Sequence, residues 1–203
     1  MAEYLTIAAP AEAQYTDKRS RFLAFALPVR DAAEARAAVA DLQRRYHDAR
    51  HVCWAYMLGS ARTDFLSNDN GEPSGTAGKP ILGQINSLGL SDVLVAVVRY
   101  FGGVKLGTGG LAVAYKTAAA EALQAAVIEE RIMTADFRVS VPYADADVAM
   151  RYVREAGAQI TAREYTAIGA VLTIAVRLDD EAALRSRLSK IRSLHFTDEN
   201  VAE

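Results

Sequence analysis

The chain has 203 residues, of which 51% are hydrophobic, so it is long and apolar enough for one large or two small folded domains. Its 23 basic and 25 acidic side chains nearly balance, which excludes the overall basic excess of a strong nonspecific nucleic-acid binder and leaves only a local patch for such contacts. A single cysteine excludes an internal disulfide, the apolar runs are too short to span a membrane, and no targeting segment is recognisable, so we expect a cytoplasmic protein.

The first 131 residues alternate apolar strands with amphipathic helices. A strand is predicted over residues 21–29, and a helix over residues 31–47 with Asp31 as its N-cap. Residues 60–80 are dense in Gly, Ser, Asn, Asp and Pro and predict a long functional loop. The remaining predicted elements are a strand over 51–59, a helix over 79–89 that ends at Gly89, a buried strand over 92–101 and an alanine-rich helix over 111–127.

The remaining residues predict a second, smaller unit with the element order β-α-β-β-α-β. This order, in about 70 residues, is the split β-α-β or ferredoxin-like pattern. The sequence therefore predicts an α+β protein with domains at residues 1–131 and 132–203. The predicted elements of the second domain are strands over 136–143, 158–167, 169–178 and 193–198 and helices over 145–157 and 179–191.

The glycine-rich stretch RYFGGVKLGTGGLAVAY, residues 99–115, lies between the buried strand and the alanine-rich helix. The residue types from Gly107 to Ala112 match the dinucleotide-binding fingerprint G-x-G-x-x-A. However, five residues separate the strand end from Gly107, and no further βαβ units follow, so dinucleotide binding is disfavoured. The stretch GEPSGTAGKP also fails as a phosphate-binding P-loop, because Pro73 and Pro80 replace the first glycine and the hydroxyl residue.

Two interpretations of the glycine-rich stretch stay open. In the first, Thr108 caps the long helix, whose bare N–H groups at Gly109 and Gly110 receive an anion with help from Arg99 and Lys105. In the second, the glycines serve tight turns and close packing of the backbone. The glycines concerned outside the helix start are Gly102, Gly103 and Gly107.

Polar side chains crowd the loop that precedes the helix predicted over 79–89. Its carboxylates, Asp69 and Glu72, suit acid and base roles in an enzyme, while Ser74 and Thr76 add hydroxyl groups and Lys79 a cation. The alternative is turn chemistry, in which these side chains bond to the backbone of their own loop. We further hypothesise that this loop and the glycine-rich stretch meet in space and form one ligand surface.

Three further features have both a functional and a structural interpretation. His51 and Cys53 share a strand face, as metal ligands or a nucleophile pair would, but a core cysteine and a partly buried imidazole are the favoured explanation. Aromatic side chains on or next to strands could stack bases or fill the core. These aromatic residues are Trp54, Tyr56, Tyr100 and Phe101. We expect no metal and no cofactor.

Several ordered segments resemble the IMPACT family, also called the YigZ-type family. They are KRSRFLAFALPV, DARHVCWAY, NGEPSGTAGKPIL and VLVAVVRYFGGVKLGTGGLAVAY, and the resemblance covers roughly residues 15–127. Residues 132–203 resemble the small C-terminal domain of bacterial members. Two positions depart from the family pattern: Asn70 replaces an aspartate and Val113 replaces a basic residue. Both departures weaken the case for a metal site, and both slightly weaken the case for a phosphate site.

The resemblance implies a fold and a class of function. The N-terminal domain would resemble the second domain of a small-subunit ribosomal protein and domain IV of elongation factor G, and the C-terminal domain would be ferredoxin-like. Eukaryotic members regulate translation by protein contact, and bacterial members are proposed to bind nucleic acid or ribosomes. We therefore expect a non-enzymatic, translation-associated factor that binds RNA, the ribosome or a translation-factor partner. The alternative is an enzyme that acts on a phosphorylated small molecule.

Overall fold

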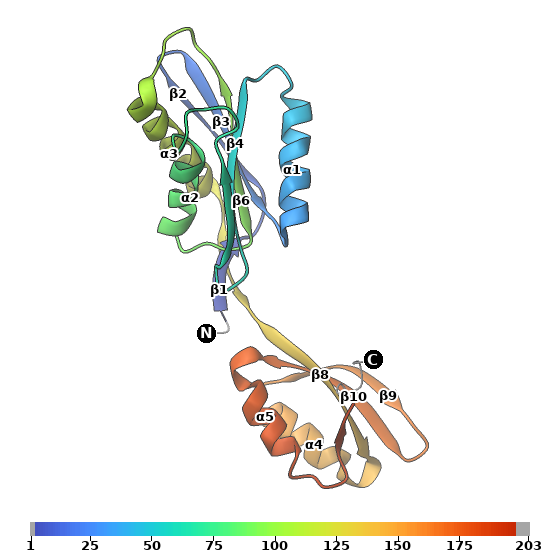
Figure 1. The fold of residues 1–203 in the computed structure, drawn as a ribbon. Helices are drawn as coiled ribbons and strands as arrows, with labels where there is room; N and C mark the ends of the chain where they lie inside the picture. The colour runs from blue at the N-terminus through green and yellow to red at the C-terminus, as the bar shows by residue number, and fades with distance from the viewer. Residues whose placement is uncertain (1–2, 198–203) are drawn as a thin grey trace. The chain divides into compact units, whose positions relative to one another are not determined.

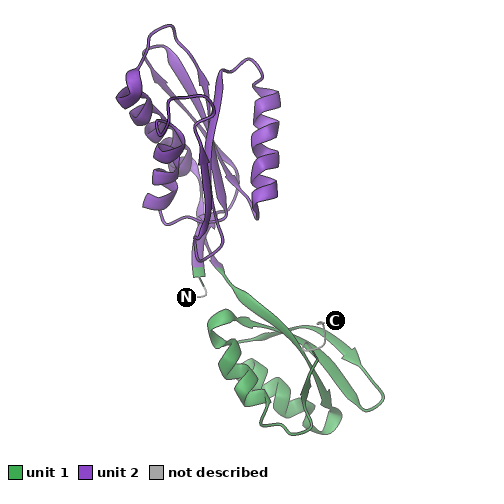
Figure 2. Cartoon of the chain, in the orientation of Figure 1, with its two compact units in different colours: residues 1–3, 132–203 green, residues 4–131 purple. Residues whose placement is uncertain are grey.

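The structure, a computed structural model that describes residues 3–197, divides into two compact units (Figure 1, Figure 2). One unit spans Tyr4–Arg131, and the other contains Glu3 with residues 132–197. Both combine helices with antiparallel sheets, so the chain is an α+β protein, as the sequence predicts. The end of the strand predicted over 193–198 lies outside the described residues. No described helix has the length and apolar character needed to cross a membrane.

The larger unit is built around a five-stranded antiparallel sheet with the strand order β2-β3-β6-β4-β5. Helix α1 covers one face of this sheet, and α2 and α3 cover the other (Figure 1). Strands β1 and β7 form a separate two-stranded sheet. The elements are β1 (Glu3–Ile7), β2 (Ala11–Asp17), β3 (Ser20–Pro28), α1 (Ala32–Arg45), β4 (His51–Leu58), β5 (Asp64–Asn68), α2 (Gly78–Ser87), β6 (Val93–Tyr100), α3 (Gly107–Ala125) and β7 (Ile128–Ile132).

The central strand β6 is buried on both faces because helices cover both sides of the sheet. Its side chains alternate between two apolar cores, as the two-residue period of a strand requires. The core beneath α2 and α3 takes Val93, Val95 and Val97. The core beneath α1 takes Leu94, Ala96 and Val98. A strand buried on both faces reads as an unbroken apolar run, which is why the sequence predicts it clearly.

Local sequence signals correctly predicted the start of α1 and the end of α2, but not the start of α3. Asp31 caps α1 by accepting a hydrogen bond from the Glu34 N–H group at 2.8 Å, as predicted. The predicted stop at Gly89 is also confirmed, because its N–H group bonds to Asn86 just after α2 ends. The prediction that Thr108 caps α3 is wrong. The helix already begins at Gly107, so Thr108 is its second residue and no side chain caps it.

Four strands of the larger unit, β1, β2, β5 and β7, were not predicted. Strand β5 interrupts the predicted loop over 60–80, so that loop is two shorter segments around an edge strand. None of the five residues of β5 is buried, and Phe65 is 54% exposed. A strand without a buried face has no alternation of apolar and polar residues, and the sequence pattern therefore gives no signal for it.

The smaller unit has the predicted β-α-β-β-α-β order. Its four antiparallel strands are arranged β11-β8-β10-β9, and α4 and α5 pack on the core side of the sheet. The elements are β8 (Thr134–Pro142), α4 (Tyr143–Glu155), β9 (Gln159–Tyr165), β10 (Gly169–Arg177), the 3₁₀ turn η1 (Leu178–Asp180), α5 (Glu181–Leu188) and β11 (His195–Phe196). Its core shares no residue with the two cores of the larger unit.

Candidate anion-binding site

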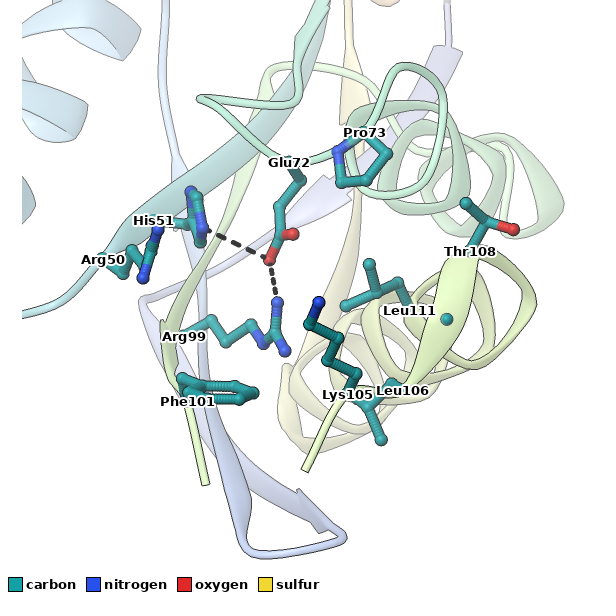
Figure 3. A pocket seen from close by; sticks show the side chains of 11 residues that line it. Arg50, His51, Glu72, Pro73, Arg99, Phe101, Lys105, Leu106, Thr108 and Leu111 are labelled. Atoms are coloured by element: carbon teal, nitrogen blue, oxygen red, sulfur yellow. Dashed lines mark hydrogen bonds and ion pairs between the residues drawn. The ribbon is translucent and has the colours of Figure 1, made fainter. Parts of the chain in front are cut away.

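A pocket of about 390 Å³ lies where the start of β4, the end of β6 and the start of α3 meet the loop before α2 (Figure 3). The structure therefore brings the polar loop and the glycine-rich stretch together on one surface, as hypothesised from the sequence. The residues that line the pocket are Arg50, His51, Glu72, Pro73, Arg99, Phe101, Lys105, Leu106, Gly107, Thr108 and Leu111.

A buried ion pair between Glu72 and Arg99 forms one wall of the pocket. The Glu72 Oε1 atom lies 2.5 Å from an Arg99 guanidinium nitrogen, and the two side chains are only 3% and 8% exposed. The Tyr115 hydroxyl, buried on α3, donates a second hydrogen bond to the same oxygen at 2.9 Å. This carboxylate therefore has a fixed position and is already engaged by two donors.

The Arg99 guanidinium has hydrogen-bonding capacity that the described residues do not satisfy. Its Cζ atom lies 5.7 Å from the ring centroids of both Phe22 and Phe101, so two aromatic rings flank the group. Its Nε atom is buried and has no hydrogen-bond partner within residues 3–197. Figure 3 shows the side-chain ends of Arg99 and Lys105 pointing into the same space. Arg99 therefore brings a cationic group to the pocket wall, with one buried donor that the described residues do not use.

The His51 ring forms part of the pocket wall and is held in place by the loop before α2. Its Nδ1 atom lies 2.8 Å from the Asn70 carbonyl oxygen, and because a carbonyl can only accept, Nδ1 carries the proton. The other ring nitrogen, Nε2, lies 3.9 Å from Glu72 Oε1. The ring therefore lies between the Asn70 carbonyl group and the Glu72 carboxylate.

The start of α3 adds positive potential to the pocket. Gly107 and Thr108 line it, no side chain caps the helix, and no acidic residue lies in the first turn. The first N–H groups of a helix lack internal partners and attract anions. Side chains add to this field, because three cationic residues and one carboxylate line the pocket. The pocket is thus locally basic in a chain whose formal net charge is −2.

Asp69 does not line the pocket but holds its loop in shape. Its carboxylate accepts hydrogen bonds from the N–H groups of Gly75, Ala77 and Gly78 at 2.8–2.9 Å. Burial by itself would raise the pKa of Asp69, but these hydrogen bonds outweigh burial and lower the pKa below its ordinary value. The structure therefore agrees with the interpretation that Asp69 bonds to the backbone of its own loop.

Replacing Asp69 with asparagine is expected to destabilise the larger unit by about 1–3 kcal/mol at neutral pH, because three N–H groups lose a charged acceptor. The carboxylate has a lowered pKa in the folded state, so its contribution is present above the unfolded pKa and is lost as pH falls through the folded one. Urea unfolding of both proteins between pH 7 and pH 3 should show their difference shrinking with acidification. A difference that stays constant with pH would contradict this account.

The predicted site residues fall into two groups. Those in the pocket lining are His51, Glu72, Arg99, Lys105, Gly107 and Thr108. Those outside the lining are Asp69, Ser74, Thr76, Lys79, Tyr100, Gly102, Gly103, Gly109 and Gly110. Tyr100 follows Arg99 on the strand and packs toward the α1 core, where its hydroxyl donates to Asp48. Thr76 is buried and donates to the Pro73 carbonyl.

Sequence reasoning missed several pocket residues. Arg50 directly precedes β4, and Pro73, Leu106 and Leu111 form apolar parts of the wall. Tyr115 was missed because its hydroxyl lies within an alanine-rich helix that reads as simple packing. The available signal was its position four residues after Leu111, which places both on one helix face.

The Cys53 thiol has no role in the pocket, because it contacts other groups and is buried. Its Sγ atom lies 2.9 Å from the Asp69 carbonyl oxygen and 3.3 Å from the Tyr115 hydroxyl. Burial raises the pKa of this thiol to about 12, which suppresses the thiolate needed for nucleophilic or metal chemistry. Within residues 3–197 no three His, Cys, Asp or Glu side chains are grouped so that they could hold a metal ion.

Comparison with known proteins covers both units. Residues 18–123 match the Impact N-terminal domain, and residues 139–191 match a domain of unknown function, DUF1949. An "IMPACT family member" of Haemophilus influenzae is 37% identical over 146 residues, 70% of each chain. The Escherichia coli "IMPACT family member YigZ" is 35% identical over 147 residues, 70% of this chain and 71% of that protein.

A solved structure supports the same relationship across both units. The crystal structure described only as that of a hypothetical protein matches with a TM-score of 0.70 and 28% identity, and the match covers 97% of both chains. The sequence matches include the polar loop and the start of α3, which are the two segments that meet in the pocket. The chain therefore belongs to the IMPACT family.

Proposed function

We propose that this IMPACT family chain is a non-enzymatic, translation-associated factor that binds RNA by holding a backbone phosphate in the pocket between β4, β6 and α3. The observation that carries the proposal is the Arg99 guanidinium, which lines a basic pocket together with Lys105 and the uncapped start of α3. Phosphate oxygens accept hydrogen bonds from arginine, lysine and helix N-termini. All three kinds of donor line this pocket.

The near-neutral charge of the whole chain fits a local contact rather than broad RNA affinity. Three cationic side chains, Arg50, Arg99 and Lys105, are found among the described residues that line the pocket, so few phosphates are neutralised at once. The salt dependence of binding scales with the number of phosphates contacted. We therefore expect a shallow salt dependence rather than the steep one of a highly basic protein.

The enzymatic alternative has less support from the geometry. An acid–base pair needs two groups that face the substrate. Asp69 lies outside the pocket and is bonded to three backbone N–H groups, while Glu72 is engaged by Arg99 and Tyr115. Dinucleotide binding is disfavoured further, because β6 is antiparallel to both of its neighbours and a Rossmann unit needs parallel strands.

Removing both exposed cations of the pocket tests the proposal. The double variant Arg50→Gln, Lys105→Gln keeps Arg99, which Glu72 needs as a partner. Titration of labelled single-stranded RNA across a salt series should show weaker binding for the double variant and a salt slope smaller by about 2, one for each cationic side chain removed. Arg36→Gln, Lys116→Gln is the matched control, since both residues are exposed and neither lines the pocket.

Two results would contradict the RNA proposal. The first is a wild-type protein whose RNA binding is absent or does not change with salt. The second is a double variant whose affinity and slope equal those of the control. Co-sedimentation with ribosomes provides the second arm: the wild type and the control should pellet, and the double variant should stay in solution. Equal pelleting of all three would place any ribosome contact outside the pocket.

A further inference from the structure

We infer that the pocket accepts one whole nucleotide unit, with the phosphate at Arg99 and Lys105 and the base stacked on the exposed ring of Phe101. This inference rests on the proposed function, because the same pocket holds the phosphate. It adds a recognition element that a simple backbone contact does not need. The ligand would be a nucleoside monophosphate or an unstacked nucleotide of single-stranded RNA.

Phe101 is the accessible aromatic residue at this place. Its side chain lines the pocket and the residue is 48% exposed. The other aromatic residues noted in the sequence make their contacts outside the pocket. Trp54 and Tyr56 are buried and stacked on each other, with ring centroids 5.9 Å apart, and Tyr100 packs toward the α1 core. An exposed phenylalanine beside cations is a common surface for base stacking.

The end of β6 sets the distance between the cation and the ring. Arg99 and Phe101 are two residues apart, and the Arg99 Cζ atom lies 5.7 Å from the Phe101 ring centroid. Figure 3 shows both side chains on the same side of the pocket, below Glu72. A phosphate held at Arg99 would therefore have an aromatic surface directly beside it. Bases joined to a phosphate through a sugar are ligands with this combination of groups.

The rest of the wall suits a ligand that is both charged and apolar. Pro73, Leu106 and Leu111 line the pocket next to the cationic side chains. An inorganic anion would leave these apolar side chains uncontacted. The pocket volume of about 390 Å³ falls within the range of small-ligand sites, about 300–1,000 Å³. A nucleotide therefore fits the chemistry of the wall better than phosphate alone.

Titration with nucleotide fragments tests the inference. The probes are adenosine 5′-monophosphate, ribose 5-phosphate, inorganic phosphate and adenosine, each measured by calorimetry against the full chain. We expect the monophosphate to bind most tightly. Phe101→Leu should weaken its binding about 5- to 150-fold, the range for loss of one base stack, and leave ribose 5-phosphate unchanged. Phe65→Leu is the matched control, because Phe65 is also exposed but lies on β5 outside the pocket.

A tryptophan at the same place gives an independent readout. The chain has one tryptophan, Trp54, which is 9% exposed. In Phe101→Trp the new indole should be quenched by adenosine 5′-monophosphate and not by ribose 5-phosphate. Because Phe101 is exposed, both variants should keep the wild-type unfolding midpoint in urea. That measurement separates loss of binding from loss of folding.

The outcomes distinguish this inference from the proposed function. If Phe101→Leu binds the monophosphate as tightly as the wild type does, or if the monophosphate binds no better than ribose 5-phosphate, base stacking is overturned. RNA binding that still depends on Arg50 and Lys105 would then leave the proposed function standing. If no phosphate-bearing probe binds and RNA shows no salt-dependent binding, both fall together.

Discussion

Replacing Glu72 with alanine is expected to destabilise the larger unit by about 3–5 kcal/mol, the cost of leaving one partner of a buried ion pair uncompensated. The Arg99 side chain is 8% exposed and would keep its charge, while the Tyr115 hydroxyl would lose its acceptor. Urea denaturation followed by tryptophan fluorescence measures the effect, because Trp54 lies in the core of the same unit.

A charge-free double variant separates the ion pair from simple loss of packing. Glu72→Leu combined with Arg99→Met removes both charges and should recover most of the lost stability, since apolar replacements of buried pairs are often neutral. The exposed pair of Arg30 and Glu34 provides the control, because Glu34→Ala should lower the unfolding midpoint far less than Glu72→Ala does. A Glu72→Ala variant with wild-type stability would show that the pair is solvated. It would contradict the description of the pocket wall as a buried ion pair.

Replacing Gly102 with alanine should be the most damaging change in the glycine-rich stretch, at about 3 kcal/mol. A Cβ atom there would lie 2.1–2.4 Å from the backbone of Arg19 and Ser20, and a backbone cannot swing aside as a flexible side chain can. The Gly102 N–H group also donates to the Ser20 hydroxyl at 3.1 Å. Because Gly102 lies between Phe101 and Lys105 in the chain and both line the pocket, the variant should lose RNA binding as well as stability.

Two neighbouring glycines are controls that should give different results. Gly103→Ala meets no atom within 4 Å, but the backbone has φ +87°, so a cost of about 1 kcal/mol is expected. Gly109→Ala lies in the first turn of α3, also meets no atom, and should stabilise the protein by about 0.5–1 kcal/mol. Equal effects of all three substitutions on the unfolding midpoint would show that close backbone packing is not what Gly102 provides.

The elements with a buried face could be predicted from the sequence, and those without one could not. The period of Ala35, Val39 and Leu42 predicted α1, and the run before Arg99 predicted β6. Strand β5 exposes all or part of every side chain, so its existence depends on hydrogen bonds to β4 rather than on burial. Backbone hydrogen bonds do not require a pattern of apolar residues, so the sequence pattern does not predict this strand.

The pocket was predictable as a meeting of two segments but not in its chemistry. The spacing of Gly, Ser and carboxylate residues indicated that both segments are special. Which carboxylate would face Arg99 depended on where the loop crosses β4 and β6, and only the fold decides that. Asp69 and Glu72 are three residues apart and look alike in the sequence, yet one holds the loop and the other the guanidinium.

Because side chains alternate along β6, the position of a residue in the strand determines which face of the sheet its side chain lies on. Odd-numbered positions from Val93 to Arg99 face α2 and α3, and even-numbered positions face α1. Inserting one residue before Arg99 would carry the guanidinium to the α1 face and bring Tyr100 into the pocket, whereas inserting two would preserve the order of the faces. An insertion of one residue in β6 would therefore separate Arg99 from Glu72, whereas an insertion of two would leave both on the same face of the sheet.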